Sequence, residues 1–206
     1  MNLSLAIYLT TLMLSFSLSC TSQKKVLTFD VVRNEKTLGK IIFSQTSSGK
    51  TDSLNMEYKV NAKLVGTVTA EVRETAVFND GVLVQSSIYR KMNGNEKANK
   101  SQRVTTGKYV VANGKKSKEI NIYPITYSML SLYSYEPLNI SQVYSDNFEA
   151  MVPVKRIQNH QYIVTLPDKS YNYYLYTDGT LTEVVIHHTL YSAKFVLTGR
   201  EINGSY

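Results

Sequence analysis

The chain has 206 residues, of which 43% are hydrophobic and 19% charged, with 10 Gly, 4 Pro and a single Cys. This composition excludes an intrinsically disordered chain, a collagen-like repeat and a scaffold held by several disulfides. The length is typical of one domain with a substantial hydrophobic core.

The net charge of +7 is concentrated in one part of the chain. Residues 90–118 hold nine basic residues against one acidic residue, and the rest of the chain is close to neutral. We interpret this segment as a candidate basic surface, which is either a solvated edge or a contact for an anionic membrane or a protein. Nucleic acid is not an expected partner, because Tyr109 is the one aromatic residue in the segment. The basic residues are Arg90, Lys91, Lys97, Lys100, Arg103, Lys108, Lys115, Lys116 and Lys118.

The N-terminus has the pattern of a secretory signal peptide. Residues 3–18 are uncharged and mostly apolar, but this run is shorter than the roughly 20 residues of a spanning helix, which is the alternative. The following Ser19-Cys20 is similar to a bacterial lipoprotein signal, in which the cysteine is acylated, whereas ordinary cleavage nearby would leave a free thiol. We predict a signal peptide at 1–19, a tether at 20–25 and an exported domain at 26–206. The protein is then periplasmic or anchored to a membrane of the cell envelope through Cys20.

Strand patterns begin directly after the tether. Residues 26–32 and 37–46 flank a polar turn, and apolar residues then alternate at every second position over residues 54–64. Such alternation buries one face of a strand and exposes the other. A return strand is expected over residues 68–78.

Four dipeptides predict tight hairpin turns: Asp80-Gly81, Asn93-Gly94, Asn113-Gly114 and Asp178-Gly179. Both central residues of a type I′ turn need positive φ, which Asn, Asp and Gly tolerate best. Consecutive hairpins predict one antiparallel meander of about ten strands, with an all-β fold.

Residues 122–135 differ from this pattern. Ile125, Met129 and Tyr133 recur at helical spacing, which predicts one short helix near 125–134. A sheet of this size must close on itself or have a face covered. We therefore expect a strongly curved sheet, a half-barrel or a barrel, with the helix as a plug; a β-sandwich is the alternative.

Candidates for catalysis and metal binding are weak. His187 and His188 are adjacent and point to opposite faces of a strand, so the two cannot share a metal ion in regular β geometry. A metal site would need His160, one of these two and carboxylates from elsewhere, and no spacing supports it. Ser145, His188 and Asp146 could form a hydrolytic trio, but no nucleophile-elbow motif supports it. We expect a protein without catalytic residues, metal or cofactor.

Tyrosines gather in two stretches of the chain. Packing between strands explains such clusters, and an amphipathic lining for a ligand is the functional interpretation. The candidate ligand-lining residues are Tyr127, Tyr133, Tyr171 and Tyr173.

Three strings in the C-terminal half carry a resemblance: YSDNFE at 144–149, LPDKSYNYYLY at 166–176 and EVVIHHTLYSAKFVL at 183–197. They resemble a family of exported bacterial proteins known as domain of unknown function 6134, and residues 29–39 are similar too. The resemblance implies an exported all-β domain and assigns no activity or site.

Two functions remain open. The first is a cell-envelope domain that binds a lipid or other amphiphile in the concave face of its sheet. The second is a structural or interaction module that docks to an envelope protein or anionic surface through the basic hairpins of residues 90–118.

Overall fold

The computed structural model describes residues 22–64, 66–188 and 191–204. The predicted signal peptide and Cys20 lie outside these residues. The first strand begins at Ser22, so Ser22 to Lys25 belong to the sheet and not to a tether as predicted. Their backbone groups find partners in the last strand, where Gly204 pairs with Gln23, and this pairing extends the strand into polar sequence.

One sheet contains all the strands of the described residues. The N-terminal half comprises β1 (Ser22–Arg33), β2 (Lys36–Ser48), β3 (Thr51–Leu64), β4 (Gly66–Asn79), β5 (Val82–Met92), β6 (Asn95–Thr105), β7 (Lys108–Asn113) and β8 (Lys116–Ile120). The C-terminal half comprises β9 (Gln142–Ser145), β10 (Ala150–Gln158), β11 (Gln161–Thr165), β12 (Tyr171–Thr177), β13 (Thr180–His188) and β14 (Tyr191–Gly204). The predicted all-β antiparallel meander is confirmed. The described residues form fourteen strands and not about ten, because polar strands such as β6 and β8 lack the alternation that reveals a strand.

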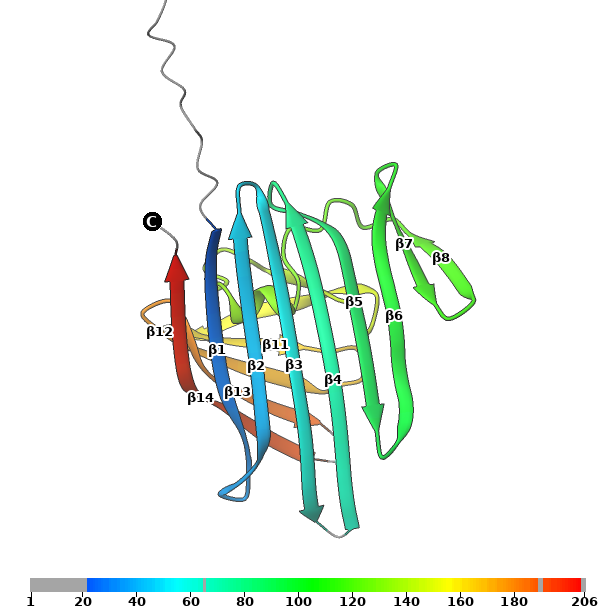
Figure 1. Cartoon of the computed structure of the whole chain (residues 1–206). Helices are drawn as coiled ribbons and strands as arrows, with labels where there is room; N and C mark the ends of the chain where they lie inside the picture. The colour runs from blue at the N-terminus through cyan, green and yellow to red at the C-terminus, as the bar shows by residue number, and fades with distance from the viewer. Residues whose placement is uncertain (1–21, 65, 189–190, 205–206) are drawn as a thin grey trace, which may run out of the picture.

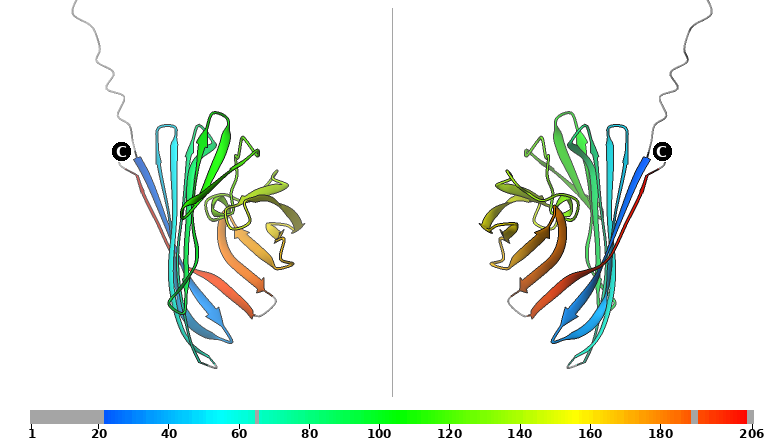
Figure 2. Two further views of the ribbon diagram at one scale, coloured as in Figure 1. Left: turned by 90° about the vertical axis from the view of Figure 1, so that its right-hand side faces the viewer. Right: turned by 90° about the vertical axis from the view of Figure 1, so that its left-hand side faces the viewer.

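Each strand pairs with its neighbours in sequence, and β1 also pairs with β14. The first and last strands thus lie in the middle of the sheet, whose outer edges are β8 and β9. The sheet bends so that the two halves face each other as two layers (Figures 1 and 2). Because β8 and β9 do not pair, the sheet is not closed.

The space between the two layers is the hydrophobic core. Alternate residues point into it, and Leu27, Phe29, Ile41 and Phe43 of β1 and β2 are completely buried. Gly39 of β2 has no room for a side chain, since an added Cβ would lie 2.5 Å from the carbonyl oxygen of Lys59.

The predicted turns are mostly confirmed. Asp80-Gly81, Asn93-Gly94 and Asp178-Gly179 have positive φ at both residues. The fourth turn is shifted by one residue: Asn113 ends β7, and Gly114 takes the positive φ. A fifth turn, Asn34-Glu35, adopts the same left-handed geometry without glycine.

The segment between β8 and β9 fills one end of the core and is called the plug (residues 121–141). The predicted helix near 125–134 is wrong, because the plug has a single 3-10 turn, Leu130–Tyr133. The Met129 N–H donates to the Tyr144 carbonyl and the Tyr144 N–H to the Tyr127 carbonyl, at 2.8 and 2.9 Å. These bonds join the start of the segment to β9 in a parallel bridge, so its backbone is not free to form a helix.

Candidate functional site

The two tyrosines predicted near the plug have different surroundings. Tyr133 is buried, and its ring lies 5.7 Å from that of Phe29 and 5.6 Å from that of Phe43. Tyr127 is half-buried, and its hydroxyl donates to the carbonyl oxygen of Tyr135. Burial raises the pKa of both phenols, so both stay neutral. Tyr133 is therefore a core residue that is not open to a ligand.

Tyr171 and Tyr173 do not line the concave face, which corrects their assignment to one site with Tyr127 and Tyr133. On β12 they alternate with the buried Asn172, Tyr174 and Tyr176, so they point to the outer face. The prediction that Tyr171 and Tyr173 share one face, opposite Tyr174 and Tyr176, is confirmed.

The concave face has two ends with different burial. Near the plug, inward side chains such as Leu27 and Phe43 are fully buried. Toward the Asn34-Glu35 turn, several inward apolar side chains are only partly buried, although Val31 is buried. Some plug residues, Tyr127, Met129 and Ile140, are partly buried too. Pairing across the strands places the partly buried side chains toward the turn near one another, since Gly39 lies opposite Val60 and Ile186 opposite Ala193. We call this the open end, with the partly buried residues Leu38, Tyr58, Val60, Ile186 and Ala193.

The nine basic residues do not form one surface. Arg90, Lys100 and Lys118 turn toward carboxylates, which corrects their assignment to a single basic face. Lys108 pairs with the exposed Glu119 at 2.9 Å. Among these nine residues, those that are exposed and have no described ion pair are Lys97, Arg103, Lys115 and Lys116.

Lys100 and Lys118 belong to a polar contact between β5, β6 and β8 and the turn after β9, which we call the polar seam (Ser86, Lys100, Lys118, Asp146 and Glu149). Lys100 Nζ lies 2.6 Å from Glu149 Oε1 and donates to the Asn147 carbonyl at 3.0 Å. Lys118 Nζ lies 2.5 Å from Glu149 Oε2. Ser86, which is fully buried, donates to Asp146 Oδ1 at 2.5 Å. The seam joins the two halves on the side where the sheet is open.

The carboxyl groups beside the seam have shifted pKa values. Burial raises the pKa of Asp146 to about 6, against hydrogen bonding from Ser86. Burial also raises the pKa of Glu74, whose Oε1 lies 3.7 Å from Arg90 Nη2. Glu149 is different: burial acts to raise its pKa, but Lys100 and Lys118 hold it below the usual value. At neutral pH the seam is thus a balanced set of charges held together by hydrogen bonds.

The seam was not predicted, and one signal could have indicated it. Asp146 and Glu149 form a short acidic turn in an otherwise balanced C-terminal half, opposite in charge to residues 90–118. Nothing in a single sequence places that turn against β6 and β8.

The candidate catalytic trio is not brought together. Asp146 accepts a hydrogen bond from Ser86, and Ser145 on the edge strand β9 is separated from His188 on β13 by the strands β10–β12. His160 lies elsewhere, with Nδ1 3.0 Å from Glu136 Oε1, and His187 stacks on Tyr171. Within the described residues, no group of three His, Cys, Asp or Glu side chains is placed to hold a metal ion.

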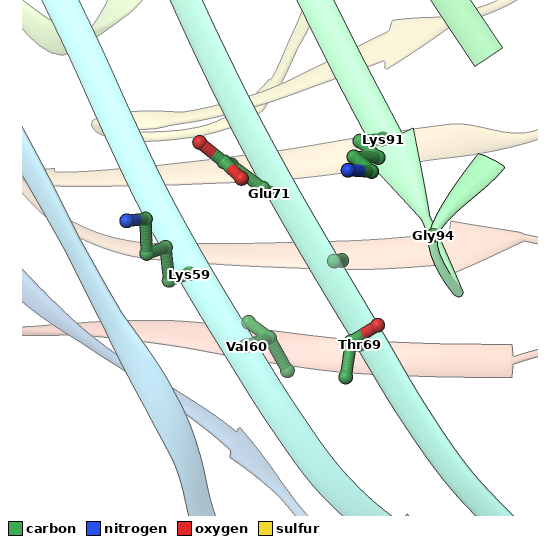
Figure 3. Close-up of a pocket in the computed structure, with 7 residues that line it drawn as sticks. Lys59, Val60, Thr69, Glu71, Lys91 and Gly94 are labelled. Atoms are coloured by element: carbon green, nitrogen blue, oxygen red, sulfur yellow. The ribbon is translucent and has the colours of Figure 1, made fainter. Parts of the chain in front are cut away.

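Two shallow, open depressions lie on the surface. The first has a volume of about 350 Å³ on β3, β4 and β5, where register places Lys59, Glu71 and Lys91 side by side (Figure 3). The second, of about 310 Å³, lies on β10–β13 and includes Tyr173, Gln161 and Glu183. Neither depression is the concave face predicted for a ligand.

These features define the class of the protein as an open, antiparallel β-meander domain that wraps around a plug. The family described as a domain of unknown function (DUF6134) matches residues 29–198, and the chain belongs to this family, as its sequence resemblance implied. No curated protein matches the sequence. In the part of the chain that the structure describes, no helix is long and apolar enough to cross a membrane.

Among solved structures, the fold is similar to a β-barrel-like protein of a domain of unknown function (DUF1849) from Brucella abortus. The TM-score is 0.60 at 10% sequence identity, and the match covers 89% of this chain and 98% of that chain. At this identity the similarity concerns the fold alone.

Proposed function

We propose that this protein is a non-catalytic domain of the bacterial cell envelope that binds a lipid or other amphiphile at the open end of its concave face. The observation that carries the proposal is the group of inward, partly buried apolar side chains at the open end, which cross-strand pairing brings together. These side chains are still in contact with water. An acyl chain packed against them would remove this apolar surface from water, which is favourable by about 25 cal/mol per Å².

The chemistry of the open end supports an amphiphile more than a polar ligand. Leu38, Ile186 and Ala193 offer apolar surface, and Tyr58 adds a ring with a polar end. Arg90 and Glu74 lie on the inner face of neighbouring strands, where Arg90 pairs with Val72, the residue opposite Tyr58. An amphiphile matches this arrangement, because its apolar chain can pack on the apolar side chains of the open end and its polar head can contact Arg90 and Glu74.

The proposed localisation to the cell envelope is based on the N-terminal sequence. Residues 1–19 have the features of a signal peptide, and Cys20 is placed for acylation. Two or three acyl chains give a stable anchor, whereas one is marginal. An anchored domain with an open apolar face would meet amphiphiles at the membrane.

The proposal is tested by native mass spectrometry of the exported protein and by titration with the fluorescent fatty acid 11-(dansylamino)undecanoic acid. We expect either a bound mass released on denaturation or saturable fluorescence. Ile186→Asp at the open end should abolish binding, and Ala193→Phe should weaken it by filling the space. The control is Ile42→Asp, because Ile42 is 52% exposed. Absence of binding in both assays, or equal loss in the control, overturns the proposal.

The alternative, docking through the basic hairpins, retains less support. Four of the nine basic residues, namely Arg90, Lys100, Lys108 and Lys118, pair with carboxylates of the same chain. Lys115, in the turn between β7 and β8, and Lys116, the first residue of β8, are the favoured contacts for an envelope protein or an anionic membrane. Binding to anionic vesicles that is salt-sensitive and lost in a Lys115→Glu, Lys116→Glu variant would favour this alternative.

A further inference from the structure

The outer faces of the two halves have opposite chemistry. On β3–β5 the outward row Lys59, Glu71 and Lys91 alternates in charge. On β11–β13 the corresponding outward row is Ile163, Tyr173 and Val185, directly opposite one another. An apolar row on the outer face of a sheet is a sign of an interaction site.

The aromatic residues of this face form a fixed cluster. The ring of Tyr171 stacks on that of His187 at 4.8 Å and 22°. The ring of Tyr173 meets those of Tyr171 and His187 edge-on, at 5.5 and 5.7 Å. These contacts hold the ring of Tyr173 in one orientation beside the second depression.

The depression combines an apolar floor with polar ends. Gln161, Leu175 and Glu183 form one cross-strand row, with the amide and the carboxylate on either side of the leucine. Val185 and Tyr173 extend the floor into the next row. Lys194 Nζ lies 3.0 Å from Glu183 Oε2 and holds that carboxylate in place.

We propose that this depression binds a carbohydrate, with one sugar ring lying on Tyr173 and Leu175. A pyranose has an apolar face of C–H groups, which pack against the electron-rich face of an aromatic ring, and an edge of hydroxyl groups. The hydroxyls would donate to the Glu183 carboxylate and exchange hydrogen bonds with the Gln161 amide. An open, shallow depression with a volume of about 310 Å³ suits a ligand that stays partly hydrated, unlike an acyl chain. This site is separate from the open end and independent of the proposed function.

The test is saturation-transfer NMR on the exported protein with soluble tetrasaccharides of glucose, N-acetylglucosamine, mannose and galactose. We expect at least one to bind through its ring protons. Tyr173→Ala should weaken that binding about tenfold, and Glu183→Gln should weaken it by a smaller factor. The matched control is Tyr89→Ala on β5, an outward tyrosine whose ring contacts the Arg73 guanidinium at 4.8 Å.

Two results would overturn the proposal. One is the absence of transfer to every tetrasaccharide at millimolar concentration. The other is binding that Tyr173→Ala leaves unchanged or that Tyr89→Ala reduces equally. Circular dichroism of each variant separates loss of the site from loss of the fold. The carbohydrate result does not affect the test of amphiphile binding, because Ile186 and Tyr173 lie on opposite faces of the sheet.

Discussion

The two halves of the sheet meet along two lines of different chemistry. On one side, β1 and β14 pair over ten residues, from Gln23 opposite Gly204 to Val32 opposite Lys194. On the other side, β8 and β9 are sheet edges, and the polar seam joins the halves through side chains. Backbone pairing is insensitive to most substitutions, whereas the seam depends on a few charged groups.

This difference teaches how an open sheet can hold a closed core. An unpaired side would expose the core, and the plug with the seam covers it. Buried charges are costly unless each is paired, so the seam is the more vulnerable of the two lines. The following predictions separate the contributions of the two sides.

The largest expected effect is at the plug, where it packs on the hydrogen-bonded side. Tyr133→Ala removes a buried ring from Phe29 and Phe43, and should lower the free energy of unfolding by about 4 kcal/mol. Urea denaturation measures it. Tyr123→Ala is the control, because Tyr123 is 49% exposed. Equal losses in the two variants would show that the plug does not support the core.

The next effect is on the seam. Lys100→Met leaves the Glu149 carboxylate with Lys118 alone, and should cost about 3 kcal/mol. Lys108→Met breaks an ion pair of the same type that is exposed at both ends, and should cost under about 1 kcal/mol. A loss in Lys100→Met no greater than in Lys108→Met would contradict a seam that holds the two halves together.

The seam also predicts a pH dependence. Because the pKa of Asp146 is about 6 in the folded protein and 3.8 is its ordinary value, the folded state binds more protons than the unfolded state between these values. Stability should therefore fall as pH rises from about 4 to 6, by about 2 to 3 kcal/mol, since a tenfold change in proton affinity is worth about 1.4 kcal/mol. Glu74 acts with the same sign, and Glu149, whose pKa is lowered, acts oppositely below its ordinary value.

Two variants test whether Asp146 causes this dependence of stability on pH. The measurement is thermal unfolding of each variant across the pH range. Asp146→Asn should flatten the slope. Ser86→Ala removes the hydrogen bond that lowers the pKa of Asp146, so the fall in stability should start at the same pH and extend to higher pH. An Asp146→Asn profile identical to that of the unmodified protein would assign the pH dependence elsewhere.

The smallest effect concerns the bend of the sheet near the hydrogen-bonded side. Gly39→Ala places a Cβ against the Lys59 carbonyl, and should cost about 1 to 2 kcal/mol through a shift of β2 against β3. Gly199→Ala on β14 is the control, because its nearest contact is Thr28 Cβ at an ordinary 3.4 Å. Similar melting temperatures for the two variants would show that β2 and β3 adjust freely.

The sequence predicts the hydrogen-bonded side well and the seam poorly. The alternation in β1–β3 and the turns at Gly81, Gly94 and Gly179 are local signals, and they predict the strands and their connections. The single helix near 125–134 is wrong because Ser128 and Ser131 bond with backbone N–H groups and Met129 bonds to β9, which periodicity cannot report. The sequence shows that Lys97 and Lys100 are both basic, but it does not show that Lys97 is exposed and Lys100 points inward. That difference depends on where each residue lies along β6.

The candidate site is predicted only in part. The tyrosine pattern of β12 correctly separates Tyr171 and Tyr173 from Tyr174 and Tyr176. Which of the two faces is the concave one depends on how a curved sheet bends, and that is a property of all the strands together. The open end could not be found either, since Leu38 and Ile186 look like ordinary core residues in the sequence.

The pairing of β1 with β14 also has a consequence for the order of events during folding. Thr198 Oγ1 donates to the Thr28 carbonyl across 170 residues. Bringing such distant segments together carries a loop-closure entropy cost of about 4 to 5 kcal/mol. This cost is offset only when the pairing of β1 with β14 is complete. The hairpins of each half can form early, but β1 keeps an unpaired edge until the last strand is available. A contact order this long predicts slow folding, with the β1–β14 pairing among the last contacts to form.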